Sequence, residues 1–275
     1  MPSPELDTIT IKGFKSIASI EKLKLRPINV VIGSNGSGKS NFIGVFSFLH
    51  AIREGHLQDY VAKAGGAEKV LHFGSKVTKE LYLHISFQNG DNQYEITLQS
   101  TQADNLIPKT EWVYLWNKEI DRERPWSYEL SMIGKETGIS APNGEGSSIA
   151  NYVCHHLDSL RLYHFQDTSS SSPMKKTVSL NDNHYLRSDG SNLAAFLYYL
   201  REKHEVAYRL IRSTVQLVAP FFDDFQLLPS KLNPDTIILQ WRHKNSEAYF
   251  DAASFSDGTL RFIALARSID VSCLE

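Results

Sequence analysis

The octapeptide at residues 33–40, GSNGSGKS, constrains the fold of this 275-residue chain more than any other feature. It matches the pattern G-x-x-x-x-G-K-[ST] at every fixed position. Glycines in such a loop adopt positive φ angles and let the main chain approach a phosphate, and the following helix points its N-terminus at the anion. The octapeptide therefore predicts a loop that binds the phosphates of a nucleotide.

The sequence on either side of the loop predicts the setting that a phosphate loop needs. Residues 27–33, PINVVIG, form a continuous apolar run that indicates a strand buried on both faces, as in a parallel sheet. Residues 40–52 carry apolar side chains at helical spacing, and Gly55 ends that run. This context favours a nucleotide-binding loop over a Gly/Ser linker that contains a lysine by chance.

Two side chains of the loop have distinct predicted roles. Lys39 would reach the β- and γ-phosphates, and the Ser40 hydroxyl would bind Mg²⁺. The predicted nucleotide contacts in this loop are Gly33, Ser34, Asn35, Gly36, Ser37, Gly38, Lys39 and Ser40.

Strands predominate in the rest of the first half. Alternating apolar and polar residues predict an antiparallel layer, and NGDN at residues 89–92 predicts a hairpin within it. The first two strands would turn at Gly13. The predicted strands lie within residues 6–20, 81–87, 94–98, 112–116 and 126–130, and residues 133–147 are expected to form a loop.

Helices predominate in the second half. The pair His155–His156 has no cysteine or spaced carboxylate nearby, so we predict a structural role for it rather than a metal site. Asp223 and Asp224 are interpreted as a solvated pair in a loop. Predicted helices lie at residues 148–157, at 193–218 (one broken helix or two) and from about 258, and predicted strands at 160–165 and 236–243. We expect two lobes: a nucleotide-binding lobe, residues 1–160, and a helical lobe, residues 161–275.

Composition excludes several classes of protein. The net charge of −2 gives no sign of a polyanionic partner, and 41% hydrophobic residues is ordinary for a globular chain. Cys154 and Cys273 are far apart, which argues against a disulfide framework or a zinc knuckle. The N-terminus does not resemble a signal peptide, and no run of 18 apolar residues occurs. We expect a cytoplasmic protein without a membrane partner.

A second motif, SFSDGTLRFIALA at residues 254–266, resembles the signature motif of ABC-type ATPases. An ordinary capped helix would explain it in isolation, but a phosphate loop lies upstream. The resemblance matches Ser256 to the family serine and Gly258 to the second glycine, which contact the γ-phosphate bound to the opposite subunit. Asp257 and Thr259 replace the Gly and Gln of transporters, so a transporter subunit is not expected.

Three further stretches resemble the RecF/SMC-like branch of these ATPases. ITIKGFKSI at residues 9–17 is similar to the N-terminal strand and turn of that branch. RLYHFQDTS at residues 161–169 and LRSDGSNLAAFLYYL at residues 186–200 resemble a compact bacterial subgroup of RecF-like or OLD-like AAA-family ATPases, which includes ATPases of anti-phage defence. The resemblance implies an α/β P-loop NTPase fold, with a mixed sheet, an antiparallel β layer and a helical lobe that carries the signature.

The resemblance also implies cofactors and partners. ATP with Mg²⁺ would lie between Lys39 of one copy and Ser256 of another in a head-to-tail dimer, either a homodimer or a heterodimer with a related ATPase. ATP binding would close the dimer and hydrolysis would open it. DNA or an effector nuclease would read that switch.

Gln166 has two interpretations. It follows a predicted strand, where the family's Q-loop glutamine senses Mg²⁺ and the attacking water, so the resemblance makes it a nucleotide and metal contact; the alternative is a surface glutamine. Lys12 and Lys15 would flank the adenine or the phosphates, or would be exposed lysines on a turn between two strands.

In the family, the signature helix leads to a strand that ends in Asp-Glu, where the Glu polarises the attacking water. Here RSIDVSCLE follows, so we nominate no catalytic residue and expect a chain cut before this Walker B motif. We therefore predict weak binding and little hydrolysis. The alternative is a non-catalytic module that binds nucleotide and regulates a partner ATPase. A small-molecule kinase or a GTPase is a weaker alternative: a kinase would not need the motif at Ser256–Gly258, and a GTPase should show an Asn-Lys-x-Asp motif, which is not present.

Overall fold

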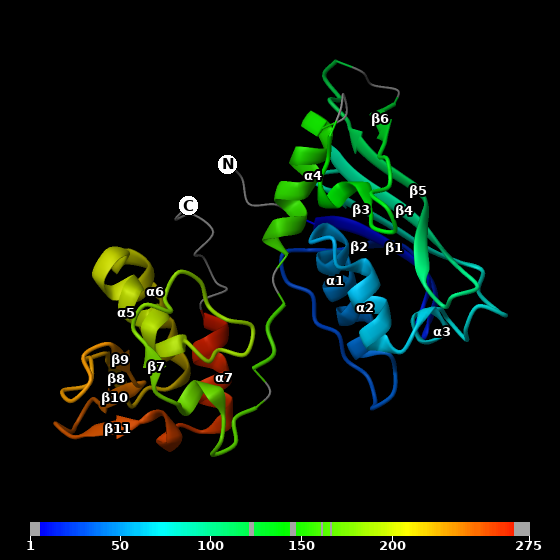
Figure 1. Cartoon of the computed structure of the whole chain (residues 1–275). Helices are drawn as coiled ribbons and strands as arrows, with labels where there is room; N and C mark the ends of the chain where they lie inside the picture. The colour runs from blue at the N-terminus through cyan, green and yellow to red at the C-terminus, as the bar shows by residue number, and fades with distance from the viewer. Residues whose placement is uncertain (1–5, 121–123, 144–146, 161, 166, 267–275) are drawn as a thin grey trace. The chain divides into compact units, whose positions relative to one another are not determined.

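A computed structural model describes residues 6–120, 124–143, 147–160, 162–165 and 167–266. The chain divides into two compact units, residues 1–160 and residues 161–275 (Figure 1). Every strand pair among the described residues is antiparallel. The structure is therefore an α/β fold with an antiparallel layer, as the sequence predicts.

The N-terminal unit is a six-stranded sheet covered by helices. The strand order is β2-β1-β3-β4-β5-β6. The strands are β1 (Leu6–Phe14), β2 (Ile17–Lys24), β3 (Glu80–Phe87), β4 (Asn92–Ser100), β5 (Leu106–Leu115) and β6 (Trp126–Glu129). The helices are α1 (Lys39–Arg53), α2 (Leu57–Ala64), α3 (Ala67–Val70) and α4 (Ser147–Ser159), with a 3₁₀ turn at Gly138–Ser140.

One face of this sheet forms the core of the unit. Alternate residues of β3 and β4, such as Leu83, Ile85 and Ile96, are fully buried, as expected for strands with one covered face. The helices α1 and α4 pack on that face (Figure 1). In α1 the buried residues Phe48 and Ile52 lie one turn apart, and the Phe48 ring lies 5.4 Å from the ring of Phe14 in β1. This contact holds the helix that follows the phosphate loop against the sheet.

The C-terminal unit surrounds a second, separate core. Its helices are α5 (Leu193–Lys203), α6 (Glu205–Val218) and α7 (Asp257–Ala266), with 3₁₀ turns at Pro173–Lys175 and Ala252–Ser254. A three-stranded sheet has the order β11 (Tyr249–Asp251), β10 (Gln240–His243), β8 (Phe222–Gln226). A two-stranded pair joins β7 (Val178–Ser179) to β9 (Thr236–Ile237).

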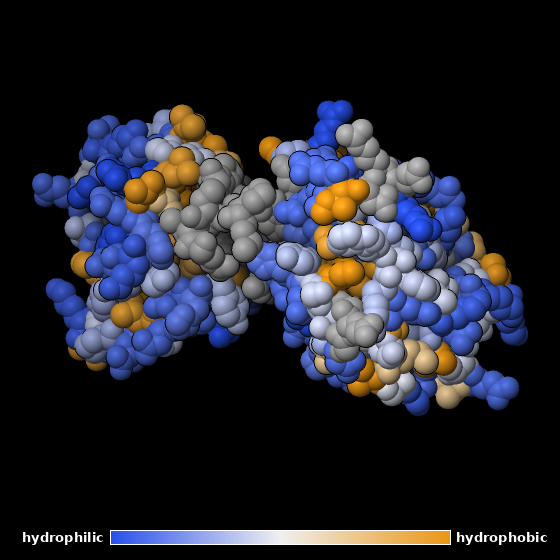
Figure 2. Space-filling model, turned by 90° about the horizontal axis from the view of Figure 1, so that it is seen from above, coloured by the Kyte–Doolittle hydropathy of each residue, from blue (hydrophilic) through white to orange (hydrophobic). Residues whose placement is uncertain are grey.

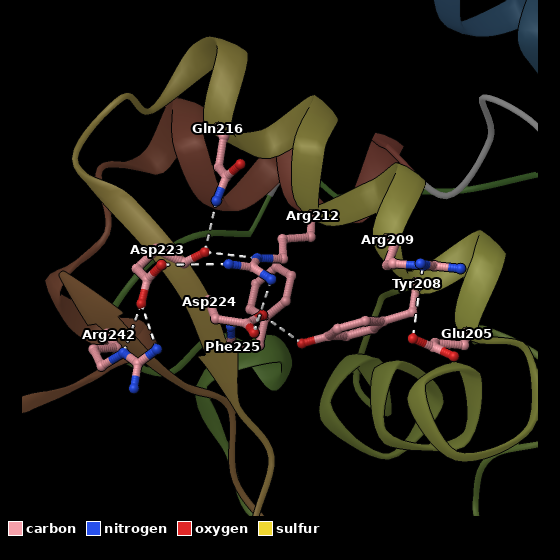
Figure 3. Close-up of polar contacts among 9 residues, drawn as sticks. All are labelled: Glu205, Tyr208, Arg209, Arg212, Gln216, Asp223, Asp224, Phe225 and Arg242. Atoms are coloured by element: carbon pink, nitrogen blue, oxygen red, sulfur yellow. Dashed lines mark hydrogen bonds and ion pairs between the residues drawn. The ribbon is translucent and has the colours of Figure 1, made fainter. Parts of the chain in front are cut away.

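Polar contacts fasten α6 to the three-stranded sheet (Figure 3). Arg212 of α6 donates from Nε to the carbonyl of Asp223 at 2.9 Å, and its guanidinium pairs with Asp223 and Asp224. The hydroxyl of Tyr208 donates to Asp224 at 2.7 Å. Arg242 of β10 pairs with Asp223 from the other side. Our prediction of a solvated loop pair is therefore wrong: both carboxylates lie in β8, because Phe222 and Phe225 around them pack into the core.

Most predicted elements are confirmed; besides the pair Asp223–Asp224 and the segment before the phosphate loop, three predictions need correction. Helices α1, α4, α5, α6 and α7 and the hairpin of β3 and β4 are present. Gly13 lies inside β1, and the turn to β2 falls at Lys15 and Ser16 instead. The predicted strand at 236–243 is split between β9 and β10, which belong to different sheets.

The third correction concerns residues 160–165, where a strand was predicted. The described residues there form no strand. Tyr163 and Phe165 stack on each other at 5.3 Å, and both contact the core of the C-terminal unit. The apolar pattern that resembled a strand is explained by this packing.

The surface is largely hydrophilic on the face seen in Figure 2, with apolar side chains in separate places on both units. Within the described part of the chain, helix length and hydropathy are insufficient for any helix to span a lipid bilayer.

Candidate nucleotide-binding site

The phosphate loop ends at the start of α1. Gly36 and Gly38 have φ angles of +83° and +91°, which L side chains rarely adopt. A Cβ on Gly33 would lie 2.7 Å from the Ser37 Oγ, so the Ser37 side chain packs closely against the backbone of Gly33. No side chain caps the N-terminus of α1. Its first N–H groups are therefore available to an anion.

Lys39 reaches back over the loop. Its Nζ donates hydrogen bonds to the carbonyl oxygens of Gly33 at 2.9 Å and Ser34 at 2.7 Å. The ammonium therefore lies on the loop that would surround a phosphate. Ser40, the predicted Mg²⁺ ligand, is exposed in the first turn of the helix.

The segment before the loop differs from our prediction. Residues 27–33 form no strand, and no described strand pairs with them. Ile28 and Ile32 are 84% and 85% exposed. A strand of a parallel sheet needs a neighbouring strand to pair with and layers that cover both of its faces, and no described strand pairs with residues 27–33. The geometry of the loop therefore depends on its own glycines and on α1.

The turn between β1 and β2 supports the loop from the side. Asn41 of α1 donates from Nδ2 to the Ser16 Oγ at 2.7 Å, and a Cβ on Gly38 would lie 2.9 Å from the same oxygen. Lys15, with φ of +48°, holds its Nζ 5.4 Å from the centre of the Phe14 ring. Of the two lysines named from the sequence, Lys15 lies in this turn, whereas Lys12 forms an ion pair with Glu21 at 2.7 Å.

A groove of about 550 Å³ lies beside the first turn of α1. Sequence reasoning missed most of its lining, because the segment around Phe73 is more than 30 residues from the loop along the chain. An isolated β-bridge between Phe14 and Leu71 brings that segment to the turn between β1 and β2. The lining includes Lys15, Asn41, Glu68, Lys69, Phe73 and Gly74.

The signature residues lie at the start of α7 in the C-terminal unit. The Ser256 Oγ accepts a hydrogen bond from the Thr259 N–H at 3.1 Å, which is the contact of an N-cap serine. The two hydroxyls of Ser256 and Thr259 are 2.8 Å apart. Ser256 and Gly258 are exposed, so this helix start is open to a ligand or a partner.

Gln166 lies outside the described residues. The residues that follow it are attached to α7, because Arg261 donates to the Thr168 hydroxyl at 3.2 Å. Lys175 also donates to the Thr168 carbonyl, at 2.7 Å. The segment around Thr168 is thus anchored to the helix that carries the signature.

The residues of the loop fit a triphosphate better than they fit a complete metal site. The glycines leave room for phosphate oxygens, and the uncapped α1 with Lys39 offers positive charge. For Mg²⁺ the loop offers the Ser40 hydroxyl. In the described ranges, no group of three or more His, Cys, Asp or Glu side chains could hold a metal ion. His156 is buried instead against the Phe87 ring, at 4.7 Å, which agrees with a structural role.

Curated proteins similar to this chain are much longer. An alignment 216 residues long, which covers 71% of this chain, is 25% identical to chromosome segregation protein sudA of Emericella nidulans. A stretch of 104 residues, 38% of the chain, is 33% identical to chromosome partition protein Smc of Mycobacterium tuberculosis. An alignment 146 residues long, which covers 50% of the chain, is 30% identical to urease accessory protein 2 of Cryptococcus neoformans. These matches span 16%, 8% and 11% of the respective relatives.

A family pattern covers far more of the chain than any one of these motifs. The family described as "AAA domain, putative AbiEii toxin, Type IV TA system" matches residues 28–269, which include both the phosphate loop and the start of α7. The similarity to chromosome partition and segregation proteins agrees with this match. The chain therefore belongs to this family of AAA domains and is a P-loop ATPase domain of the SMC- and RecF-like kind.

Proposed function

We propose that the chain binds ATP on the loop of residues 33–40 and that ATP joins two copies head to tail. The observation that carries the proposal is the loop itself: positive-φ glycines lead into an uncapped helix, with Lys39 held over them. The triphosphate would replace the carbonyls of Gly33 and Ser34 as the partner of Lys39. Because an anion is a stronger partner for an ammonium than a neutral carbonyl, that exchange favours binding.

The second copy would contribute the start of α7. Ser256 and Gly258 are exposed there, and the N-terminus of α7 carries the positive end of a helix dipole. A γ-phosphate on the loop of one copy would accept hydrogen bonds from these residues of the other. The Ser40 hydroxyl would be one ligand of Mg²⁺, which would supply positive charge to the phosphates.

The proposed output is a nucleotide-dependent switch. ATP would close the dimer, and its loss would open it, so that DNA or an effector nuclease could respond to the state of the dimer. The similarity to proteins named for chromosome partition and segregation supports a DNA-related role, and membership of a family named for a toxin supports a role in anti-phage defence.

A second candidate function is a non-catalytic module that binds nucleotide and regulates a partner ATPase. The exposed apolar run that includes Ile28, Val30 and Ile32 favours this candidate, because it lies directly before the loop and has no described partner strand. Turnover distinguishes the two candidates: the switch requires hydrolysis, and the module requires binding alone.

The first experiment measures ATP affinity and turnover of the chain with Mg²⁺. Lys39→Ala should abolish saturable binding, and Lys63→Ala, which removes an exposed lysine from α2, should not. Equal affinity for both variants would contradict the proposed site. Binding without turnover supports the module, and turnover above the Lys39→Ala background supports the switch.

The second experiment tests the dimer with a matched pair of variants. Ser256→Asn and Ser256→Asp both keep an N-cap side chain on α7. Only Asp places a negative charge against the γ-phosphate of the other copy. Light scattering with ATP should therefore show a dimer for the chain and for Ser256→Asn, and a monomer for Ser256→Asp. If Ser256→Asp also dimerises with ATP, α7 does not meet the nucleotide.

A further inference from the structure

Backbone contacts hold the segment that lines the groove to the end of β1 and the turn that follows it. The Lys15 N–H donates to the Val70 carbonyl at 2.8 Å, and the His72 N–H donates to the Gly13 carbonyl at 3.0 Å. Asn41 of α1 lines the groove and hydrogen-bonds to Ser16. The groove therefore lies beside the helix whose N-terminus would hold the phosphates.

Phe73 is the unusual residue of the groove. Its side chain lines the groove and is 79% exposed, so it contributes little to any core. Its φ angle is +55°, which is an outlier for a bulky residue. It is the third residue of a turn closed by a hydrogen bond from the Gly74 N–H to the Leu71 carbonyl, a position that favours Gly or Asn. Neither burial nor backbone preference explains a phenylalanine here.

An exposed, strained aromatic residue in a groove indicates a ligand with a flat apolar face. Conformational outliers of this kind concentrate at functional sites. Apart from Leu71 and Gly74, the rest of the lining is polar: Lys15 and Lys69 offer donors, and Glu68 offers an acceptor. Hydrogen bonds from Ser75 hold the Glu68 carboxylate in place and keep its pKa below the ordinary value. A nucleobase has both a flat face and a polar edge, which fits this combination.

We propose that this groove holds the base of the nucleotide and that the base stacks on Phe73. The proposal rests on the proposed function, since the phosphates on residues 33–40 deliver the base to the groove. The groove thereby separates recognition of the nucleoside from recognition of the phosphates. Inorganic tripolyphosphate would use the loop alone, and ATP would use the loop and the groove.

The test compares binding of ATP and of tripolyphosphate to the same variants by calorimetry. Phe73→Ala should weaken ATP binding by about 5- to 150-fold, the range for loss of one base–aromatic stack, and should leave tripolyphosphate binding unchanged. Phe73→Trp should retain ATP binding. Val77→Ala is the matched control, because Val77 is an exposed apolar residue of the same segment that does not line the groove.

Phe73→Gly separates a role in binding from a role in folding. Glycine adopts the positive φ angle without strain, so this variant should melt at the same temperature as the chain or higher. It should nevertheless lose ATP affinity as Phe73→Ala does. A residue needed only for the fold would give a lower melting temperature.

Each outcome supports or overturns the proposal. ATP affinity that is unchanged in Phe73→Ala overturns the base site but leaves the phosphate site in place. Equal weakening of ATP and tripolyphosphate also overturns it, because the change would then act on the loop. If neither ligand binds the unaltered chain, the proposed function fails, and the base site fails with it.

Discussion

Glu111 is a buried hydrogen-bond acceptor that joins β5 to the 3₁₀ turn at Gly138–Ser140 in the N-terminal unit. It is 1% exposed, in the middle of β5. Its carboxylate accepts hydrogen bonds from the Tyr94 hydroxyl at 2.8 Å, from the Gly138 N–H at 2.7 Å and from the Ile139 N–H at 3.0 Å. The 3₁₀ turn at Gly138–Ser140 is thus fastened to the sheet through one side chain.

Replacing Glu111 with Ala leaves three buried donors without an acceptor. Each unsatisfied donor costs about 1–3 kcal/mol, so the free energy of unfolding should fall by about 3 kcal/mol or more. That is a large share of the roughly 5–15 kcal/mol that stabilises a typical domain. Glu111→Gln keeps the shape and one acceptor oxygen, and should cost about 1 kcal/mol.

Urea denaturation followed by tryptophan fluorescence measures this difference. Three of the four tryptophans, Trp112, Trp116 and Trp126, lie in the N-terminal unit, so fluorescence reports mainly on that unit. The transition of the N-terminal unit should move, with the Ala variant less stable than the Gln variant. A loss below 1 kcal/mol for Glu111→Ala would refute the reasoning, because the three donors would then be satisfied by other groups.

The same residue predicts a pH dependence. Burial raises the pKa of Glu111, although hydrogen bonds from Tyr94 and from the backbone of Gly138 and Ile139 lower it in part. Because the folded pKa lies above the ordinary value of 4.5, the folded state binds the proton more tightly than the unfolded state. The stability that protonation of Glu111 contributes is therefore fully present below the ordinary pKa, and it is lost as the pH rises through the pKa of the folded state. Glu111→Gln should remove this dependence.

Three further predictions address the loop, the apolar run and α6. Gly38→Ala should reduce ATP affinity, because alanine at φ of +91° costs about 1–2 kcal/mol; unchanged affinity in a binding titration would contradict the loop geometry. The pair Ile28→Thr and Ile32→Thr should change the free energy of unfolding by less than about 0.5 kcal/mol, since both side chains are exposed; a larger loss by urea titration would mean that the run is covered. Arg212→Met should destabilise the C-terminal unit by about 1–2 kcal/mol in thermal melts, because it breaks the contacts to β8; no change would mean that packing alone holds α6.

Sequence patterns predicted elements whose cause is local. Alternating apolar and polar residues in β3 and β4, with a short turn between them, identify a hairpin. Both features depend only on residues that are neighbours in the sequence. The position of α1 follows from helical spacing after the glycines.

The predictions that failed depend on distant residues. Asp223 and Asp224 looked like a solvated pair, but Arg212 and Arg242 come to them from another helix and another strand. We predicted a buried strand at residues 27–33 from their apolar composition, which does not show whether a partner strand lies beside the segment. Residues 160–165 bury aromatic rings without forming a ladder.

The two halves of the candidate site also differ in whether their contacts are local or join distant parts of the sequence. The phosphate half is local: the positive-φ glycines, the uncapped start of α1 and the contacts of Lys39 all lie within residues 33–42. A sequence motif can therefore predict the phosphate half. The loop adopts this geometry although residues 27–33 before it form no strand. The base half is tertiary, because contacts between the turn at Lys15 and the segment at Val70 bring Phe73 to the groove beside α1. A single sequence therefore predicts phosphate binding, whereas the groove proposed for the base can be identified only from the fold.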